Sequence, residues 1–313
     1  MSAYVVRRVL AILPVMLVVA TVVFAVLHLV PGDPAAVMLG PEASPEMVEA
    51  LHHELGLDRP LLLQLISWFR KVLTFDLGES LFLRCPVEKA ILQHLEATLL
   101  LGTFALLIAV ISGVALGVLA AITHGRGVDR VVMVLASIGV AIPNFWLGLL
   151  LILVFALLLR LFPVVGYAPL RLGLADTLRH LFLPAVTLGT GSAALIARMT
   201  RAAMLDVLRE DYIRTARAKG LSEHVVVFKH ALRNALVPTV TVIGFSLAGL
   251  MGGAVVTESI FNIPGVGRLL ITGVLRRDYP LVQGVVMYVA ATYVLINLLV
   301  DIVYTLIDPR VSY

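Results

Sequence analysis

Six long apolar segments separated by polar stretches dominate the pattern of this 313-residue chain. An α-helix needs about 20 apolar residues to cross the ~30 Å hydrocarbon layer of a bilayer. A backbone in lipid must satisfy its own hydrogen bonds, so each segment is predicted to be a membrane-spanning helix. The six segments are Val9–Val30, Ala97–Thr123, Val131–Leu159, Leu181–Ala197, Ala235–Thr257 and Leu281–Val300.

The fourth segment is expected to extend to Thr200, because the long Arg198 side chain can reach the membrane interface. Residues 1–313 are therefore predicted to form a single all-α transmembrane domain of six helices. Two glycine pairs, Gly113 with Gly117 and Gly249 with Gly253, predict close helix contacts within the second and fifth spans.

Composition agrees with a membrane protein. Hydrophobic residues make up 60% of the chain and charged residues 14%, with a mean hydropathy of +1.01. A soluble domain has about 45–50% apolar and 25% charged residues. The net charge of +4 is attributed to basic loops facing anionic lipid and cytoplasm, and no nucleic-acid partner is expected. Cys85 is the only cysteine, which excludes a disulfide within the chain and a thiolate metal cluster.

The first apolar segment has two interpretations, a signal peptide or a retained helix. Arg7 and Arg8 precede it, as in a signal peptide. Its length of 22 uncharged residues exceeds the apolar core of such a peptide, about 7–15 residues, and no small-residue cleavage site closes it convincingly. A retained transmembrane helix is the prediction.

Basic residues in the loops predict the orientation. With the N-terminus inside, 13 Lys and Arg lie in cytoplasmic segments and 11 outside. Five of those 11 belong to the 66-residue loop 31–96, and loops of that length largely escape the positive-inside rule. The pattern therefore predicts that both termini face the cytoplasm.

The loop 31–96 is the only sizeable polar region predicted outside the bilayer. A helix is expected to start at Pro45 with Ser44 as its cap, and a second to cover Leu61–Leu73. The loop carries ten acidic and five basic residues, which suits a docking surface. The candidates for docking an extracytoplasmic binding protein are Asp33, Asp58, Arg59 and Asp76.

The cytoplasmic loop 198–234 has eight basic and four acidic residues. An apolar stripe at helical spacing is formed by Leu205, Leu208 and Tyr212. Gly220 is expected to end that helix in the left-handed conformation, which glycine adopts cheaply, and Ser222 to cap the next helix. The prediction is a helix, a tight glycine turn and a second helix. A basic amphipathic loop lying on lipid headgroups is the alternative.

The sequence lacks the motifs by which a membrane protein would by itself hydrolyse ATP, act as a hydrolase or couple transport to ions. No Gly-x-x-x-x-Gly-Lys-Ser/Thr loop occurs, so ATP would have to be hydrolysed by another chain. Ser112 and Ser192 lack the setting of a hydrolase nucleophile. The spans hold almost no ionisable groups of the kind that couple a carrier to ions. The candidates for polar residues lining a path are Asn144, Ser246 and Asn297.

Short motifs along nearly the whole chain resemble one family in order. They are Pro31-Gly32-Asp33-Pro34, Leu55-Gly56-Leu57-Asp58-Arg59-Pro60, Asp76-Leu77-Gly78, Asp211-Tyr212-Ile213-Arg214-Thr215-Ala216-Arg217-Ala218-Lys219-Gly220-Leu221, His230-Ala231-Leu232-Arg233-Asn234-Ala235, Glu258-Ser259-Ile260-Phe261, Pro264-Gly265-Val266-Gly267, Arg277-Asp278-Tyr279-Pro280 and Asp308-Pro309-Arg310. Together they resemble ABC-importer permeases of the dipeptide, oligopeptide and nickel type, and the first of the two permeases in such an importer.

The resemblance implies a type I importer permease fold in the inner membrane and a non-catalytic transport subunit. Its partners would be a second, related permease, two ATPase subunits that bind ATP and Mg²⁺, and an extracytoplasmic substrate-binding protein. No cofactor is implied for this chain. Short peptides are the expected cargo, with nickel or glutathione as alternatives of the same family. A self-contained secondary carrier or channel is the alternative from another class.

The resemblance also implies a coupling loop that contacts the ATPase. The candidate coupling residues are Tyr212, Arg214, Thr215, Ala216, Arg217, Ala218, Lys219, Gly220 and Leu221. The general importer pattern is Glu-Ala-Ala, three residues and Gly. Aligned on Gly220, that pattern keeps only Ala216 and the glycine, so the usual acidic contact is absent. The segment Arg160–His180 is short, as in nickel and glutathione relatives.

Overall fold

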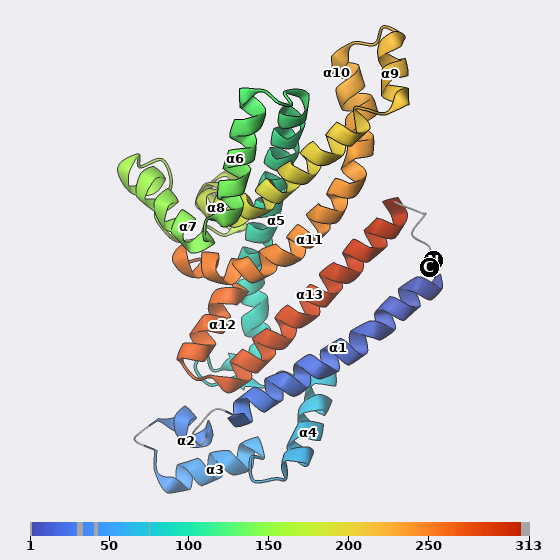
Figure 1. The fold of residues 1–313 in the computed structure, drawn as a ribbon. Coiled ribbons are helices and arrows are strands. Elements are labelled where there is room, and N and C mark those ends of the chain that lie inside the picture. The colour runs from blue at the N-terminus through green and yellow to red at the C-terminus, as the bar shows by residue number, and fades with distance from the viewer. Residues whose placement is uncertain (1, 30–33, 41–42, 75, 308–313) are drawn as a thin grey trace. The chain divides into compact units, whose positions relative to one another are not determined.

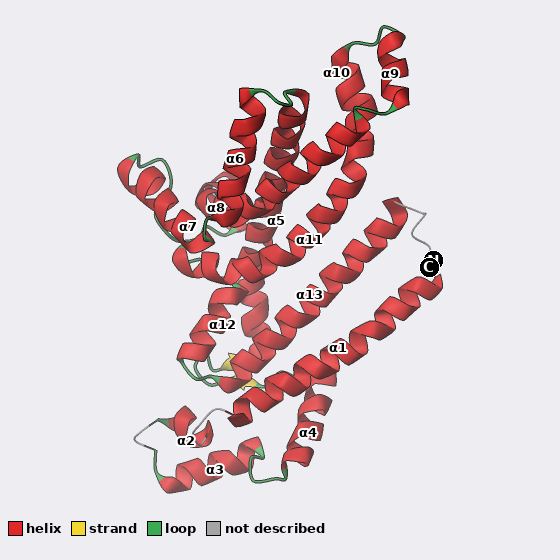
Figure 2. Cartoon of the chain, in the orientation of Figure 1, coloured by secondary structure: helices red, strands yellow, loops and turns green. Residues whose placement is uncertain are grey.

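The computed structural model describes residues 2–29, 34–40, 43–74 and 76–307. Over this part of the chain the regular structure is helical, apart from one short hairpin in which β1 (Glu79–Ser80) pairs antiparallel with β2 (Cys85–Pro86) (Figure 2). Packing divides the chain into two compact units. The first unit is Met1–Glu96 with Gly265–Leu295, and the second is Ala97–Pro264 with Ile296–Tyr313.

The first unit contains the N-terminal helices, the hairpin and two helices from the C-terminal third (Figure 1). Its elements are α1 (Ser2–Leu29), α2 (Pro34–Leu39), α3 (Pro45–Leu55), α4 (Leu61–Leu73), the start of α5 (Val87–Ile122), α12 (Val266–Leu275) and most of α13 (Tyr279–Ile307). Its core is apolar and joins the start of α5 to α12 and α13. The fully or almost fully buried members are Val87, Ala90, Ile91, Val266, Leu269, Leu281 and Val285.

Local sequence signals placed α3 and α4 of this unit correctly. Ser44 caps α3 by accepting a hydrogen bond from the Met47 amide at 3.3 Å, and Pro45 is its first residue. The predicted bounds Leu61–Leu73 are those of α4. The α4 helix is fixed to α1 because the buried Trp68 indole donates a hydrogen bond to the Ala20 carbonyl at 3.2 Å.

The second unit is a bundle built around α8. Its elements are the remainder of α5, α6 (Gly127–Ala141), α7 (Asn144–Leu151), the π-helix η1 (Ile152–Leu158), the 3₁₀-helix η2 (Leu170–Leu172), α8 (Leu174–Val207), α9 (Asp211–Ala218), α10 (Glu223–Val225), the π-helix η3 (Val226–Ala231), α11 (Leu232–Ile260) and the end of α13. In Figure 1, α9 and α10 form a hairpin-like projection beyond the ends of α8 and α11. That projection is part of the predicted coupling loop.

Glycines allow α5 and α8 to pack closely. A Cβ on Gly113 would lie 2.8 Å from Ile196, and one on Gly117 would lie 2.6 Å from Thr200. The predicted close contact of the first glycine pair is confirmed. In the second pair the prediction holds for Gly253, where a Cβ would lie 2.8 Å from Leu188, but it is wrong for Gly249, which has open space. Glycine spacing alone does not show which helix face meets a neighbour.

Four continuous helices among the described residues are long and apolar enough to cross a membrane. They are Val87–Ile122, Leu174–Val207, Glu223–Ile260 and Tyr279–Val300. They contain the predicted fourth, fifth and sixth spans and all of the second except Thr123, and each extends beyond its predicted span at one end or both. The α1 helix, Ser2–Leu29, contains the apolar stretch Ala11–Ala25, and six spans remain a prediction.

The third predicted span is interrupted. The helical segments Gly127–Ala141 and Asn144–Leu158 meet at an angle of 108°, so the predicted third span, 131–159, is not one straight helix. Proline has no amide hydrogen and disfavours the helical conformation of the residue before it. Accordingly Ile142, which precedes Pro143, has extended backbone angles of −71° and 126°. The two segments form either one broken span or a re-entrant turn.

Candidate functional site

The candidate coupling loop departs from the predicted single amphipathic helix. The α8 helix continues to Val207, a turn occupies 208–210, and α9 begins at Asp211. The turn is closed by a hydrogen bond from the Glu210 amide to the Val207 carbonyl at 3.1 Å. The predicted apolar stripe is therefore divided, because Leu205 and Leu208 lie at the end of α8 whereas Tyr212 lies on α9.

The buried face of α9 is formed by Ile213 and Ala216. Ile213 is fully buried and Ala216 is 7% exposed. They are three residues apart and so share one face of the helix. Both belong to an apolar cluster with Val226 and Val227 of η3. Ile213 was not among the predicted coupling residues, although its spacing from Ala216 was the signal that could have identified it.

The remaining candidates on α9 and its turn are presented outward. Tyr212 is 42% exposed, and its hydroxyl accepts a hydrogen bond from the Asn234 side-chain amide of α11 at 2.7 Å. The other exposed candidates are Arg214, Thr215, Arg217, Ala218, Lys219, Gly220 and Leu221. The short helix thus rests on two apolar side chains and offers a basic, polar face to its surroundings.

Gly220 has the predicted left-handed conformation, with φ at +79°. Its amide donates to the Arg217 carbonyl at 2.9 Å, and the Leu221 amide donates to the Ala216 carbonyl at 3.4 Å. This pair of bonds closes the C-terminus of α9 in the manner of a Schellman motif, which requires a left-handed residue at the glycine position. The predicted glycine turn is confirmed.

The second helix after the turn is anchored through an ion pair. Ser222 occupies the cap position of α10 with extended backbone angles, as predicted, although its side chain makes no capping bond there. Instead, Arg217 of α9 contacts the carboxylate of Glu223 at 2.8 Å. Both side chains are substantially exposed, so water and salt screen this pair and limit its contribution to stability.

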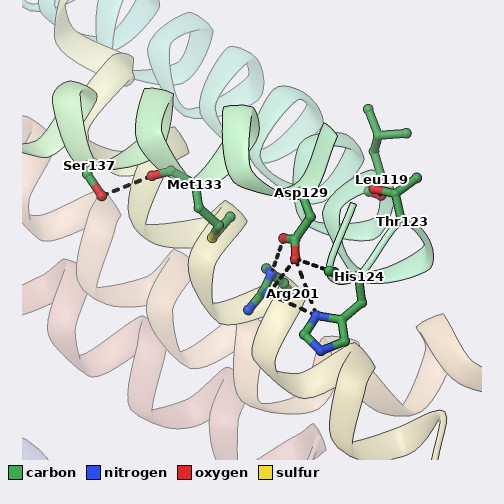
Figure 3. A network of polar contacts seen from close by, with 8 residues as sticks. Leu119, Thr123, His124, Asp129, Met133, Ser137 and Arg201 are labelled. Carbon is green, nitrogen blue, oxygen red and sulfur yellow. Dashed lines mark hydrogen bonds and ion pairs between the residues drawn. The ribbon is translucent and has the colours of Figure 1, made fainter. Parts of the chain in front are cut away.

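A buried polar network lies where the turn between α5 and α6 meets α8 (Figure 3). The Asp129 carboxylate, only 5% exposed, receives hydrogen bonds from two guanidinium nitrogens of Arg201 at 2.6 and 2.8 Å. The Gly125 amide donates to the same carboxylate at 3.0 Å. The Nδ1 atom of His124 lies 3.3 Å from Asp129 and 3.1 Å from Arg201. Sequence analysis missed this network because residues 72 positions apart form it.

The network favours the ionised form of the carboxyl group. Asp129 precedes the apolar part of α6, in the first turn of that helix. The hydrogen bond from Arg201, followed by that from the Gly125 amide, holds the pKa of Asp129 well below its usual range. The ion pair therefore persists throughout the physiological pH range.

Among the described residues, no contact joins the three predicted path-lining residues into one cluster. Asn144 is half-buried at the start of α7, where its side-chain nitrogen would lie 3.5 Å from a Cβ on Gly253 of α11. The Ser246 hydroxyl donates within α11 to the Val242 carbonyl at 2.8 Å. Asn297 is half-buried on α13. Over the same part of the chain, no group of three His, Cys, Asp or Glu side chains is placed to hold a metal ion.

The predicted docking residues of the first unit are largely engaged in local contacts. Asp58 lies 3.5 Å from His53, and Asp76 accepts a hydrogen bond from the Gly78 amide at 3.1 Å. Arg59 is exposed beside Asp58. Asp33 lies outside the described residues. Their role in docking stays a prediction.

A second buried carboxylate, part of the motif Arg277-Asp278-Tyr279-Pro280, organises the first unit, a role that the sequence does not reveal. Asp278 is 2% exposed and joins the hairpin region to the start of α13. It accepts hydrogen bonds from the Ser80 hydroxyl at 2.6 Å, the Phe82 amide at 3.0 Å and the Leu281 amide at 3.1 Å. The guanidinium of Arg276 lies over the Phe82 ring, 4.6 Å from its centroid. Asp278 thus acts as the N-cap of α13 and as a tether for the loop.

Two sequence families account for most of this chain. Residues 113–313 match the family described as binding-protein-dependent transport system inner membrane component. Residues 1–99 match the N-terminal region of binding-protein-dependent transport system membrane components. The chain belongs to this family of transport system permeases.

Individual relatives match this chain over its full length. The "Probable peptide ABC transporter permease protein y4tP" of Sinorhizobium fredii is 47% identical, with complete coverage of both chains. The "Glutathione transport system permease protein GsiC" of Salmonella typhi is 44% identical, also with complete coverage of both. The chain is therefore the permease subunit of an ABC importer, a multi-pass membrane protein of a system that includes ATPase and binding-protein components.

Solved structures agree on the fold. The methionine ABC transporter MetNI in inward-facing conformations matches with a TM-score of 0.59 at 20% identity, covering 71% of this chain and 97% of that chain. An amino acid ABC transporter crystallised with histidines matches with a TM-score of 0.51 at 16% identity, covering 72% and 95%. At these identities the similarity shows a shared importer permease fold.

Proposed function

We propose that this chain forms half of the translocation pathway of an inner-membrane importer for short peptides. The observation that carries the proposal is its full-length similarity to a peptide permease at 47% identity and to glutathione permeases at 44%. Glutathione is itself a tripeptide, so both kinds of relative belong to one substrate class. The other half would be a second, related permease, and 1–313 would act as one permease domain.

In this proposal α9 couples the permease to an ATPase subunit. The helix has an exposed basic face, two buried apolar residues beneath it and a glycine-closed end, as described above. Because the sequence has no phosphate-binding loop, two separate ATPase subunits would supply the energy. The exposed Arg59 and the neighbouring acidic residues support docking of an extracytoplasmic binding protein at the first unit.

Uptake in cells tests the cargo and the dependence on partners. Cells lacking their own peptide and nickel importers would carry this chain with its native partner subunits, and labelled di- and tripeptides would be compared with labelled nickel. We expect peptide uptake that requires every partner and is lost when this chain is expressed alone. Nickel accumulation without peptide uptake would refute the proposal that the cargo is a peptide. ATP-driven uptake by the isolated chain would refute the proposal that separate ATPase subunits supply the energy.

The proposed topology places both termini in the cytoplasm. In a background with Cys85 replaced by serine, a cysteine at the exposed Glu49 should react with an impermeant thiol reagent added to spheroplasts. A cysteine at the exposed Glu223 should react only after the membrane is opened. The two positions lie in α3 and α10 respectively, and labelling in the opposite pattern would overturn the proposed orientation.

A further inference from the structure

The ion pair between buried Asp129 and partly buried Arg201 joins two parts of the second unit that are 72 positions apart in the sequence. Asp129 lies in the first turn of α6, where the helix dipole favours a negative charge. Arg201 lies on α8, less than two turns before that helix ends at Val207. The ion pair therefore attaches the turn between α5 and α6 to the part of α8 that leads into the coupling loop.

Other close contacts occur at the same level of α8. A Cβ on Gly117 of α5 would lie 2.6 Å from Thr200, and the Thr200 hydroxyl lies 3.5 Å from that of Thr239 on α11. The end of α8 is thus in contact with α5, α6 and α11 within two consecutive residues. From this junction α8 continues to Val207, and a turn of three residues, 208–210, then leads into α9.

The geometry of the pair restricts orientation as well as distance. Two nitrogens of one planar guanidinium bind two oxygens of one carboxylate, an arrangement that only arginine can make and that lysine cannot reproduce. The Gly125 amide and His124 hold the same carboxylate from the side of the turn. Figure 3 shows Asp129, Arg201 and His124 converging at this point.

We propose that Asp129 and Arg201 form a positioning clamp that makes the turn between α5 and α6 move together with α8 when an ATPase subunit displaces α9. The inference rests on the proposed function, because it assumes that α9 is the coupling helix. It assigns a role in energy transfer to two residues outside the exposed face of α9. Without the clamp, α9 could be displaced while α5 and α6 stayed behind, so ATP would be spent without a matching opening of the pathway.

The test measures peptide transported per ATP hydrolysed by the complete importer in proteoliposomes. The variants are Asp129→Asn, Arg201→Gln, and Arg201→Lys, which keeps the charge but loses the planar fork. We expect the ratio to fall by about fivefold or more in the first two, at the lower end of typical couplings between sites. Arg201→Lys should give a smaller fall. The double variant Asp129→Asn with Arg201→Gln should be no worse than the worse single variant, because both act on one contact.

The matched control is Arg130→Gln, which removes an exposed positive charge next to Asp129. Its ratio should equal that of the wild type. If Asp129→Asn lowers the amount of assembled complex, the test of the clamp rests on the peptide transported per ATP hydrolysed by the Arg201→Lys variant. A wild-type ratio in Arg201→Lys and in any assembled Asp129→Asn complex would overturn the clamp, as would an equal loss in Arg130→Gln. If the wild-type complex itself transports no peptide, the proposed function fails instead.

Discussion

Replacing Asp278 by alanine is expected to destabilise the first unit strongly. The change would remove the acceptor of three hydrogen bonds, from the Ser80 hydroxyl and from the amides of Phe82 and Leu281. A buried donor without an acceptor costs roughly 1–3 kcal/mol, and loss of a helix N-cap about 1 kcal/mol. Phe82 is partly exposed, so water would replace part of this loss, and roughly 2–4 kcal/mol is expected.

Thermal unfolding of the purified permease measures this effect. A loss of that size should lower the midpoint by about 5–10 °C. Asp278→Asn keeps one acceptor oxygen and should have an intermediate midpoint. Asp76→Ala is the matched control, because Asp76 is an exposed carboxylate that accepts one bond, from Gly78. If Asp278→Ala unfolds at the wild-type temperature, the tether between the hairpin region and α13 does not stabilise the unit.

Replacing Gly220 by valine is expected to have the largest effect on transport while leaving the protein in the membrane. The glycine has φ at +79°, and a Cβ there would meet no atom within 4 Å. The cost is therefore conformational, roughly 1–2 kcal/mol for an L-residue in the left-handed region. A penalty of that size lowers the population of the closed turn about 5- to 30-fold. The position of α9 relative to the ATPase subunit that it is proposed to contact would become variable.

ATP-dependent uptake by the complete importer measures this second effect, together with the amount of permease in the membrane. Gly220→Val should lower uptake and substrate-stimulated ATPase activity several-fold at an unchanged membrane level. Gly220→Asn should stay close to wild type, because asparagine tolerates the left-handed conformation. Normal uptake by the valine variant would show that the turn is not needed for coupling, and loss of the protein from the membrane would show a folding role instead.

Local signals were sufficient for α3, α4 and the turn at Gly220. Ser44 and Pro45 predicted the start of α3, Pro60 preceded α4, and Gly220 predicted the left-handed turn. Each of these features depends on the conformational preference of one or two residues, which the sequence states directly. The third span shows the limit of this approach. Pro143 disfavours a continuous helix, yet the size of the bend, 108°, depends on how the segments on either side pack.

The sequence by itself determined the class of protein through apolar segments long enough for a bilayer and the family motifs, and it also predicted the left-handed turn at Gly220. These follow from composition and from residues close together in the chain. Only the tertiary structure showed that Ile213 anchors α9, that Asp129 pairs with Arg201, and that Asp278 holds the hairpin region to α13. Two of these contacts join residues 72 and 198 positions apart. A buried carboxylate is stable only where the fold brings its donors, and its sequence neighbours do not identify those donors.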